Sequence, residues 1–104
     1  MRAQAAMRPA DDQLRYRLRL YVAGMAGVST LAITNITAIC AEELGGQCDL
    51  EVIDIHQQPE LAQRDQILAI PTLVKTAPLP VRSVIGDLSQ RARVLAGLGI
   101  RGQG

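Results

Sequence analysis

Hydrophobic and polar residues alternate from Arg15 to Ala23, which is the pattern of a strand with one buried face. Tyr16, Leu18 and Leu20 fall on one face, and the arginines at 15, 17 and 19 fall on the other. Gly24 then breaks the alternation. The pattern predicts a first strand over residues 15–23 whose apolar face points toward a core.

Apolar residues next recur at helical spacing, which predicts a helix that ends at Gly45 and Gly46. Ser29 or Thr30 is expected to cap its N-terminus. Its inner stripe is expected to consist of Ile33, Ile36, Cys40 and Leu44. A second strand is predicted over residues 50–55. Because a helix separates the two strands, we expect them to be parallel and joined by a right-handed crossover.

The second half of the chain predicts shorter elements. Pro59 suits the first turn of a helix that runs through Arg64. The apolar run over residues 67–74, interrupted by Pro71, predicts a third strand. A fourth strand over residues 81–85 is expected to pair back on residues 72–76 as a hairpin.

The last helix is expected to follow Gly86, which closes the hairpin. Asp87 is predicted to cap this helix, with Gln90 as its capping-box partner. Its apolar stripe is expected to be Val94, Leu95 and Leu98. Between the third and fourth strands, Pro78 and Pro80 make a stiff, extended turn.

The predicted order β-α-β-α-β-β-α is the thioredoxin topology, an α/β fold with helices on both faces of a four-stranded mixed sheet. In thioredoxin-like proteins, a proline at the place of Pro71 usually follows a cis peptide bond. It faces the loop that carries Cys-x-x-Cys in redox enzymes. Here that loop is residues 24–29, and it contains no cysteine.

The two cysteines lie elsewhere. A thiol catalyst needs a thiolate at a helix N-terminus, whereas Cys40 falls on the apolar stripe of its helix and Cys48 falls before the second strand. We predict that Cys40 is a small core residue and that Cys48 is a turn or strand-edge residue. Both are expected to be free thiols, and a redox role is not expected.

Other chemistry finds little support in the composition. His56 is the only histidine, no His/Cys cluster has metal-ligand spacing, and the glycines fit no phosphate-binding loop. With two tyrosines and neither Phe nor Trp, the chain offers few stacking platforms for nucleic acid. No apolar run reaches the roughly 18 residues of a membrane span. We therefore expect no enzyme activity, cofactor, metal, nucleic acid or membrane, and a cytoplasmic location.

The chain of 104 residues predicts one domain over residues 14–100, with a disordered leader without a secretory signal over 1–13 and a flexible tail over 101–104. The net charge of +1 divides into +3 over residues 1–20, −5 over 21–81 and +3 over 82–104. Such a dipolar surface suits steering toward a protein partner, although ordinary solvated charge gives the same pattern.

A basic surface is the remaining candidate site. Lys75 and Arg82 lie near each other if the hairpin pairs as predicted, and Arg91 and Arg93 extend the basic character onto the last helix. The alternative is a solvated strand edge.

Several segments resemble the KaiB family of the bacterial circadian clock across residues 15–100. They are the runs at 20–24, 52–55, 59–62, 67–73, 80–89 and 94–98, of which Val84-Ile85-Gly86-Asp87-Leu88-Ser89 after the proline-rich turn is specific. The resemblance implies a non-enzymatic clock or stress regulator without a cofactor. It implies binding to the N-terminal ATPase ring of a KaiC homologue, with KaiA as a second partner in some clocks. The alternative is a thioredoxin-like adaptor or sensor that acts on a histidine kinase or another signalling partner.

The resemblance also implies a chain that switches fold. The first half is retained, and the second half takes either the thioredoxin-like arrangement or a ground-state arrangement that self-associates as a dimer or tetramer. Charge contacts with the partner are expected at Lys75 and Arg82, and the remaining contacts at the first helix and the region of the second strand. Switch or structural positions are expected at Pro71, Pro78, Pro80, Gly86, Asp87, Gly97 and Gly99. The chain departs from the family's pattern at Leu31, Gln66, Ser83, Gly99 and residues 25–27, which suggests a divergent paralogue or a reduced clock system.

Overall fold

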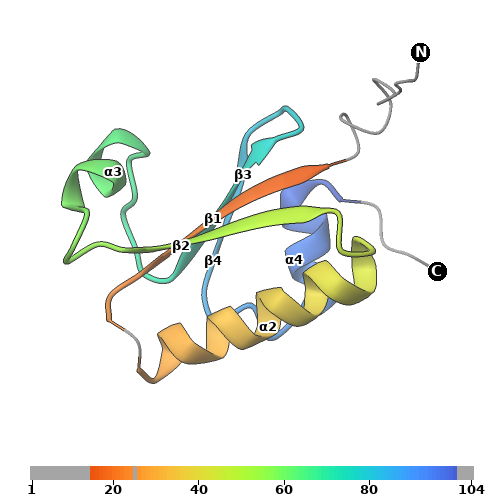
Figure 1. The fold of residues 1–104 in the computed structure, drawn as a ribbon, viewed down its shortest axis with the longest axis horizontal. Helices are drawn as coiled ribbons and strands as arrows, with labels where there is room; N and C mark the ends of the chain where they lie inside the picture. Colours follow the sequence, from red (N-terminus) through yellow and green to blue (C-terminus); the bar gives the residue numbers. More distant parts are fainter. Residues whose placement is uncertain (1–14, 25, 101–104) are drawn as a thin grey trace, which may run out of the picture.

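The computed structural model describes residues 15–24 and 26–100 (Figure 1). The predictions for the leader and the tail lie outside these residues. The elements are β1 (Tyr16–Val22), α2 (Val28–Glu43), β2 (Cys48–Asp54), α3 (Pro59–Arg64), β3 (Thr72–Ala77), β4 (Arg82–Ile85) and α4 (Arg91–Leu98). The predicted order β-α-β-α-β-β-α is confirmed.

The four strands form one mixed sheet in the order β2-β1-β3-β4. β1 and β2 are parallel, with Tyr16 opposite Cys48, as a helical crossover requires. β3 is antiparallel to both β1 and β4. The predicted hairpin is therefore confirmed, and it places Lys75 directly opposite Arg82.

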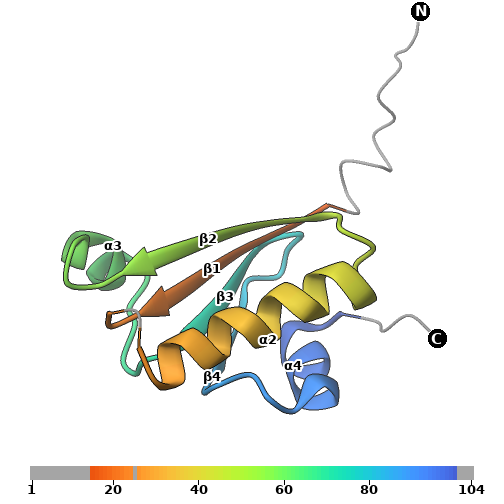
Figure 2. The same ribbon diagram turned by 60° about the horizontal axis from the view of Figure 1, so that its bottom comes forward.

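Helices cover both faces of the sheet, as predicted. On one face, α2 and α4 pack on the apolar side of β1, where the core contains Leu18, Leu20, Val22, Ile36, Ile39 and Leu98. Figure 2 shows these two helices on the same side of the sheet. On the other face, a smaller cluster of Tyr21, Ile53 and Val74 packs against Leu61, Ala62 and the chain that follows α3. Most of the core thus joins the first half of the chain to α4.

The predicted helix caps are wrong. α2 begins at Val28 after Gly27, and Ser29 is buried inside the helix without a capping hydrogen bond. α4 begins at Arg91, and its N-cap residue, Gln90, makes no side-chain cap hydrogen bond. Asp87 instead accepts a hydrogen bond from the Ser89 amide, 3.0 Å from its Oδ1 atom. This local turn competes with a helix start, because Asp side chains readily bond to amides two residues ahead.

The predicted element bounds and stripe need smaller corrections. β2 begins at Cys48 rather than at residue 50, and Cys48 is therefore the first residue of an edge strand. Ile36 and Cys40 of α2 and Leu44 directly after it are buried as predicted, but Ile33 is only half-buried. Ala32 and Ile39 are buried in addition. The expected cis bond before Pro71 is present, and the bonds before Pro78 and Pro80 are also cis.

Candidate partner-binding surface

The two predicted partner-binding residues lie side by side but differ in burial. Arg82 is exposed on β4, whereas Lys75 on β3 is only 3% exposed. The Lys75 ammonium donates a hydrogen bond to the carbonyl oxygen of Pro78 at 2.8 Å. Burial lowers the pKa of Lys75, and the neighbouring charge of Arg82 lowers it further. Of the pair, only Arg82 presents its charge to solvent in this arrangement.

Exposed apolar residues surround Arg82 on the hairpin. Leu79 is 78% exposed and Val81 is 59% exposed, on either side of Pro80. β4 is the edge strand of the described sheet on this side, so its outer backbone groups are free to pair. Exposed apolar side chains next to a charge and a free strand edge are typical of a protein-binding surface.

The end of α4 packs against this hairpin. A side chain at Gly97 would approach the Val84 Cγ2 atom to 2.7 Å, so the glycine allows α4 to lie close against β4. Gly99 ends the helix in the left-handed conformation, with φ 71°. A Cβ atom at position 99 would lie 3.8 Å from the Arg82 Nε atom. Both glycines therefore shape the side of the hairpin on which Arg82 lies.

The last helix adds less basic character than predicted. The Arg91 Nη1 atom lies 2.5 Å from Glu42 and 3.3 Å from Glu43, at the C-terminal end of α2. Its charge is thus neutralised within the chain. Arg93 is exposed. The predicted basic extension therefore rests on Arg93.

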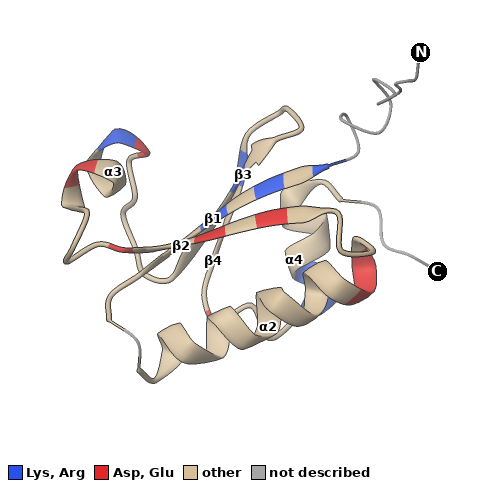
Figure 3. Ribbon diagram, viewed as in Figure 1, with Lys and Arg blue, Asp and Glu red and all other residues tan. Residues whose placement is uncertain are grey.

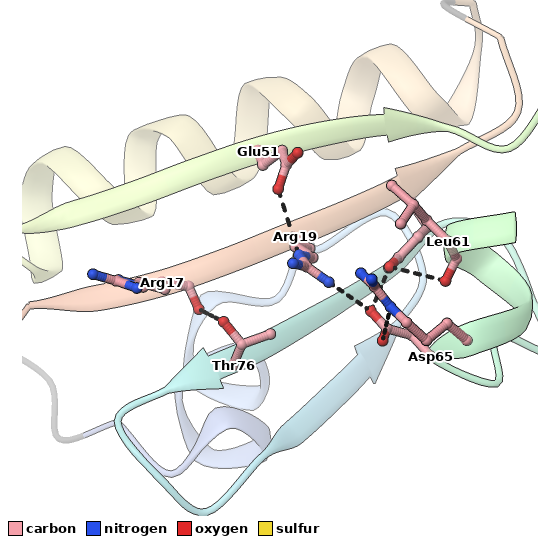
Figure 4. Close-up of polar contacts among 8 residues, drawn as sticks. Arg17, Arg19, Glu51, Leu61, Asp65 and Thr76 are labelled. Carbon is pink, nitrogen blue, oxygen red and sulfur yellow. Dashed lines mark hydrogen bonds and ion pairs between the residues drawn. The ribbon is translucent and has the colours of Figure 1, made fainter. Parts of the chain in front are cut away.

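A charged network on the opposite face was not predicted. Figure 3 shows the basic positions of β1 beside the acidic positions of β2. Arg19 lies 3.4 Å from Glu51 on β2 and 3.3 Å from Asp65 at the end of α3 (Figure 4). The Tyr21 hydroxyl donates to the same Asp65 carboxylate. The alternating arginines of β1 and the acids of β2 could have predicted this network, because parallel pairing places Arg17 opposite Asp49 and Arg19 opposite Glu51.

The network joins the two halves of the chain. Burial raises the pKa of Tyr21, and its hydrogen bond to the Asp65 carboxylate raises it further. Tyr21 is fully buried, so its hydroxyl depends on Asp65 and on the Leu61 carbonyl oxygen, 3.4 Å away. The network therefore anchors α3 to β1.

The residues with redox or metal potential do not gather at the expected loop. Cys40 and Cys48 face each other at the junction of α2 and β2, and both are free thiols. Among residues 15–24 and 26–100, no group of three His, Cys, Asp or Glu side chains could hold a metal ion. None of the described helices is both long and apolar enough to cross a membrane.

Comparison with protein families gives a match to the KaiB domain over residues 19–100. The chain belongs to the KaiB family. Circadian clock protein KaiB3 of Synechocystis sp. is 44% identical over 89% of this chain and 91% of its own length. Circadian clock oscillator protein KaiB of Microcystis aeruginosa is 51% identical over 80% of each chain.

Solved structures confirm the thioredoxin-like fold of this KaiB-family chain. The N-terminal domain of Synechococcus elongatus SasA superimposes with a TM-score of 0.70 at 22% identity, covering 100% of this chain and 95% of that domain. The thioredoxin Deadhead of Drosophila melanogaster gives 0.66 at 18% identity, covering 86% and 85%. At these identities the similarity establishes the fold alone.

Proposed function

We propose that this KaiB-family chain is a non-catalytic regulator of circadian or stress signalling that binds the N-terminal ATPase ring of a KaiC homologue. Binding changes the phosphorylation or ATPase state of that partner. The observation that supports this most strongly is a KaiB-family sequence in the thioredoxin-like arrangement, which the family resemblance associates with KaiC binding. We propose that the protein acts in the cytoplasm and without a cofactor.

The proposed docking surface is the β3–β4 hairpin together with the end of α4. Arg82 supplies the exposed charge, and Leu79 and Val81 supply apolar area at its sides. Lys75 lies beneath the hairpin turn, where its bond to Pro78 holds the turn in shape. Lys75 therefore either positions this turn or emerges when the partner displaces that bond.

We further propose that the second half of the chain switches fold. No residue of α3 is fully buried, and two non-glycine residues of this half, Gln66 and Leu88, have φ values of 57° and 65°. A left-handed conformation costs roughly 1–2 kcal/mol at a non-glycine residue. These costs reduce the advantage of the thioredoxin-like packing over an alternative, and fold switching requires two packings that differ by only a few kcal/mol. In the alternative packing, the chain is proposed to self-associate as a dimer or tetramer.

The binding test compares two charge reversals on the full chain. Arg82→Glu should weaken binding to the cognate KaiC homologue about tenfold and flatten the salt dependence of binding. The reason is that the attraction between Arg82 and an oppositely charged group of the partner becomes repulsion. Arg64→Glu is the matched control, since the Arg64 side chain is 58% exposed on α3, which is not part of the hairpin or of α4. Equal affinities for the two variants would show that the hairpin is not the docking surface. Lys75→Glu is unsuitable, because it would bury an unpaired carboxylate.

KaiA and a histidine kinase are the remaining proposed partners. Recovery of a histidine kinase but no KaiC homologue with the tagged chain would favour the adaptor function instead. The likeness to the SasA domain shows the fold alone, so it favours neither outcome.

A further inference from the structure

The sulfur atoms of Cys40 and Cys48 lie 2.7 Å apart at the junction of α2 and β2. Both side chains are free thiols. A disulfide forms without strain only where the backbone already brings two cysteines together in a suitable geometry. This contact shows that the fold itself brings the two sulfur atoms within bonding reach.

The turn between the two cysteines is held by the backbone. Gly45 and Gly46 both have positive φ values, 59° and 77°, which let the chain reverse directly after the helix. The Gly46 amide donates to the Cys40 carbonyl oxygen at 3.0 Å, and the Gln47 amide donates to the Leu44 carbonyl oxygen at 2.9 Å. The position of Cys48 relative to Cys40 is therefore fixed by this turn.

Neighbouring contacts fix the far side of the junction. The Tyr16 amide donates to the Gln47 carbonyl oxygen at 3.0 Å, which ties the turn to β1. The Arg15 guanidinium binds the Asp49 carboxylate at 2.6 and 2.9 Å, one residue beyond Cys48. These contacts thus hold the backbone on both sides of the two thiols in place.

The two thiols differ in access and in acidity. Cys40 is 9% exposed, whereas Cys48 is half-buried and lines an open depression beside Asp49 and Leu50. The hydrogen bond from the Cys48 thiol lowers the pKa of Cys40, because it stabilises the Cys40 thiolate. The same bond raises the pKa of Cys48. Cys48 is therefore the more accessible of the two thiols, and Cys40 is the more acidic one.

We propose that Cys40 and Cys48 are a redox-responsive dithiol, which a small-molecule disulfide of the glutathione class converts to an intramolecular disulfide. The Cys40 thiolate takes the proton of Cys48 as the Cys48 sulfur attacks one sulfur of oxidised glutathione, releasing one glutathione thiolate. The Cys40 thiol then loses this proton to the leaving thiolate, and its sulfur attacks the Cys48 sulfur and releases the second glutathione. Two protein thiols are oxidised, one glutathione disulfide is reduced to two thiols, and the protons pass to solvent and to the leaving thiolates.

The product would link the end of α2 to the start of β2. Both elements belong to the first half of the chain, so the bond stabilises the part that the proposed switch retains. A short loop closed in this way should raise the melting temperature by about 10 °C. The site thus gives a clock regulator an input from the thiol redox state.

The experiment equilibrates the full chain in glutathione buffers of increasing oxidised fraction, alkylates the remaining thiols and measures the intact mass. The wild-type chain should lose both alkylation sites together, gain no glutathione and stay monomeric by non-reducing electrophoresis after denaturation. Cys40→Ser is the control, because its Cys48 can form a mixed disulfide that no second thiol resolves. Wild type should reach half-oxidation at an oxidised fraction at least about tenfold lower than Cys40→Ser needs for half-glutathionylation, owing to the proximity of the second thiol.

Three results would overturn the proposal. The first is a wild-type chain that keeps both thiols alkylatable in the most oxidising buffer. The second is a chain that carries one glutathione, as Cys40→Ser does. The third is a covalent dimer in place of the intramolecular bond. Because all three are read from wild-type protein, poor folding of a variant leaves the conclusion intact.

Discussion

Tyr21→Phe removes one hydroxyl group from the network that anchors α3 to β1. Tyr21 is fully buried, and its hydroxyl donates to the Asp65 carboxylate. The ring keeps its packing against Ile53 and Val74, so the change isolates the hydrogen bond. Asp65 retains its contact with Arg19 at 3.3 Å, and the Leu61 carbonyl oxygen still accepts the Asp65 amide at 3.1 Å.

The expected cost follows from this geometry. A hydrogen bond to a charged group contributes about 1.5–3 kcal/mol to stability. The Asp65 side chain is 21% exposed, so water replaces part of the lost bond, and no buried partner is left unpaired. We expect the free energy of unfolding to fall by about 1–2 kcal/mol, which corresponds to a five- to thirtyfold change in the folded-to-unfolded ratio.

Urea unfolding at neutral pH measures this difference. The matched control is Tyr16→Phe, on the same strand but on the opposite face, because the Tyr16 hydroxyl makes no hydrogen bond within the described chain. This control should change stability by less than about 0.5 kcal/mol. Equal stabilities of the two variants would refute the anchoring role of the Tyr21–Asp65 bond.

Four further predictions concern the hairpin, the buried tyrosine of β1 and the ion pairs of α4. Gly99→Ala should cost about 1 kcal/mol in urea unfolding, because Gly99 is left-handed, and Gly99→Asn should cost less. Lys75 has a lowered pKa, so its contribution to stability should be present above its unfolded pKa of about 10.4 and be lost as pH falls through the lowered value. Stability should therefore rise from mildly to strongly alkaline pH, and Lys75→Met should abolish this rise. Tyr21 has a raised pKa and the opposite sign, so its contribution should be present below pH of about 10 and be lost as pH rises through the raised value, a loss that is absent in Tyr21→Phe. Arg91→Gln should lower the free energy of unfolding only slightly, and high salt should remove the difference, because its ion pairs with α2 are at the surface.

Local sequence patterns were sufficient for the order and the pairing of the strands, although β3 begins at Thr72 rather than at residue 67. The alternation of Leu18 and Leu20 with the arginines of β1 is a period-two signal, which assigns both faces of a strand without further context. The helix between β1 and β2 required a parallel pair, and the short turn after residue 77 required a hairpin. These features depend on neighbours in the sequence.

The errors arose where distant residues or unusual backbone angles decide the outcome. Leu88 adopts a left-handed conformation that its residue type does not suggest, so the start of α4 lies four residues after Asp87 rather than beside it. Lys75 was predicted as a surface charge, because charged residues are rarely buried, but the turn at Pro78 covers it and accepts its hydrogen bond.

The proximity of the two cysteines depends on the turn at Gly45 and Gly46. Their spacing of eight residues predicts no contact, since it spans the end of a helix and the start of a strand. Only the reversal of the chain at the two glycines brings the sulfur atoms together. Free thiols were predicted and are present, but their mutual contact was not.

Direct binding to the N-terminal ATPase ring of the cognate KaiC homologue tests the proposed function. The full chain is titrated with the purified ring, and amide hydrogen exchange is measured in the complex. We expect saturable binding, with slow exchange at the amides that pair β3 with β4, from Thr72 opposite Ile85 to Lys75 opposite Arg82. No binding, or a bound chain whose β3 and β4 amides exchange as if unpaired, would contradict it.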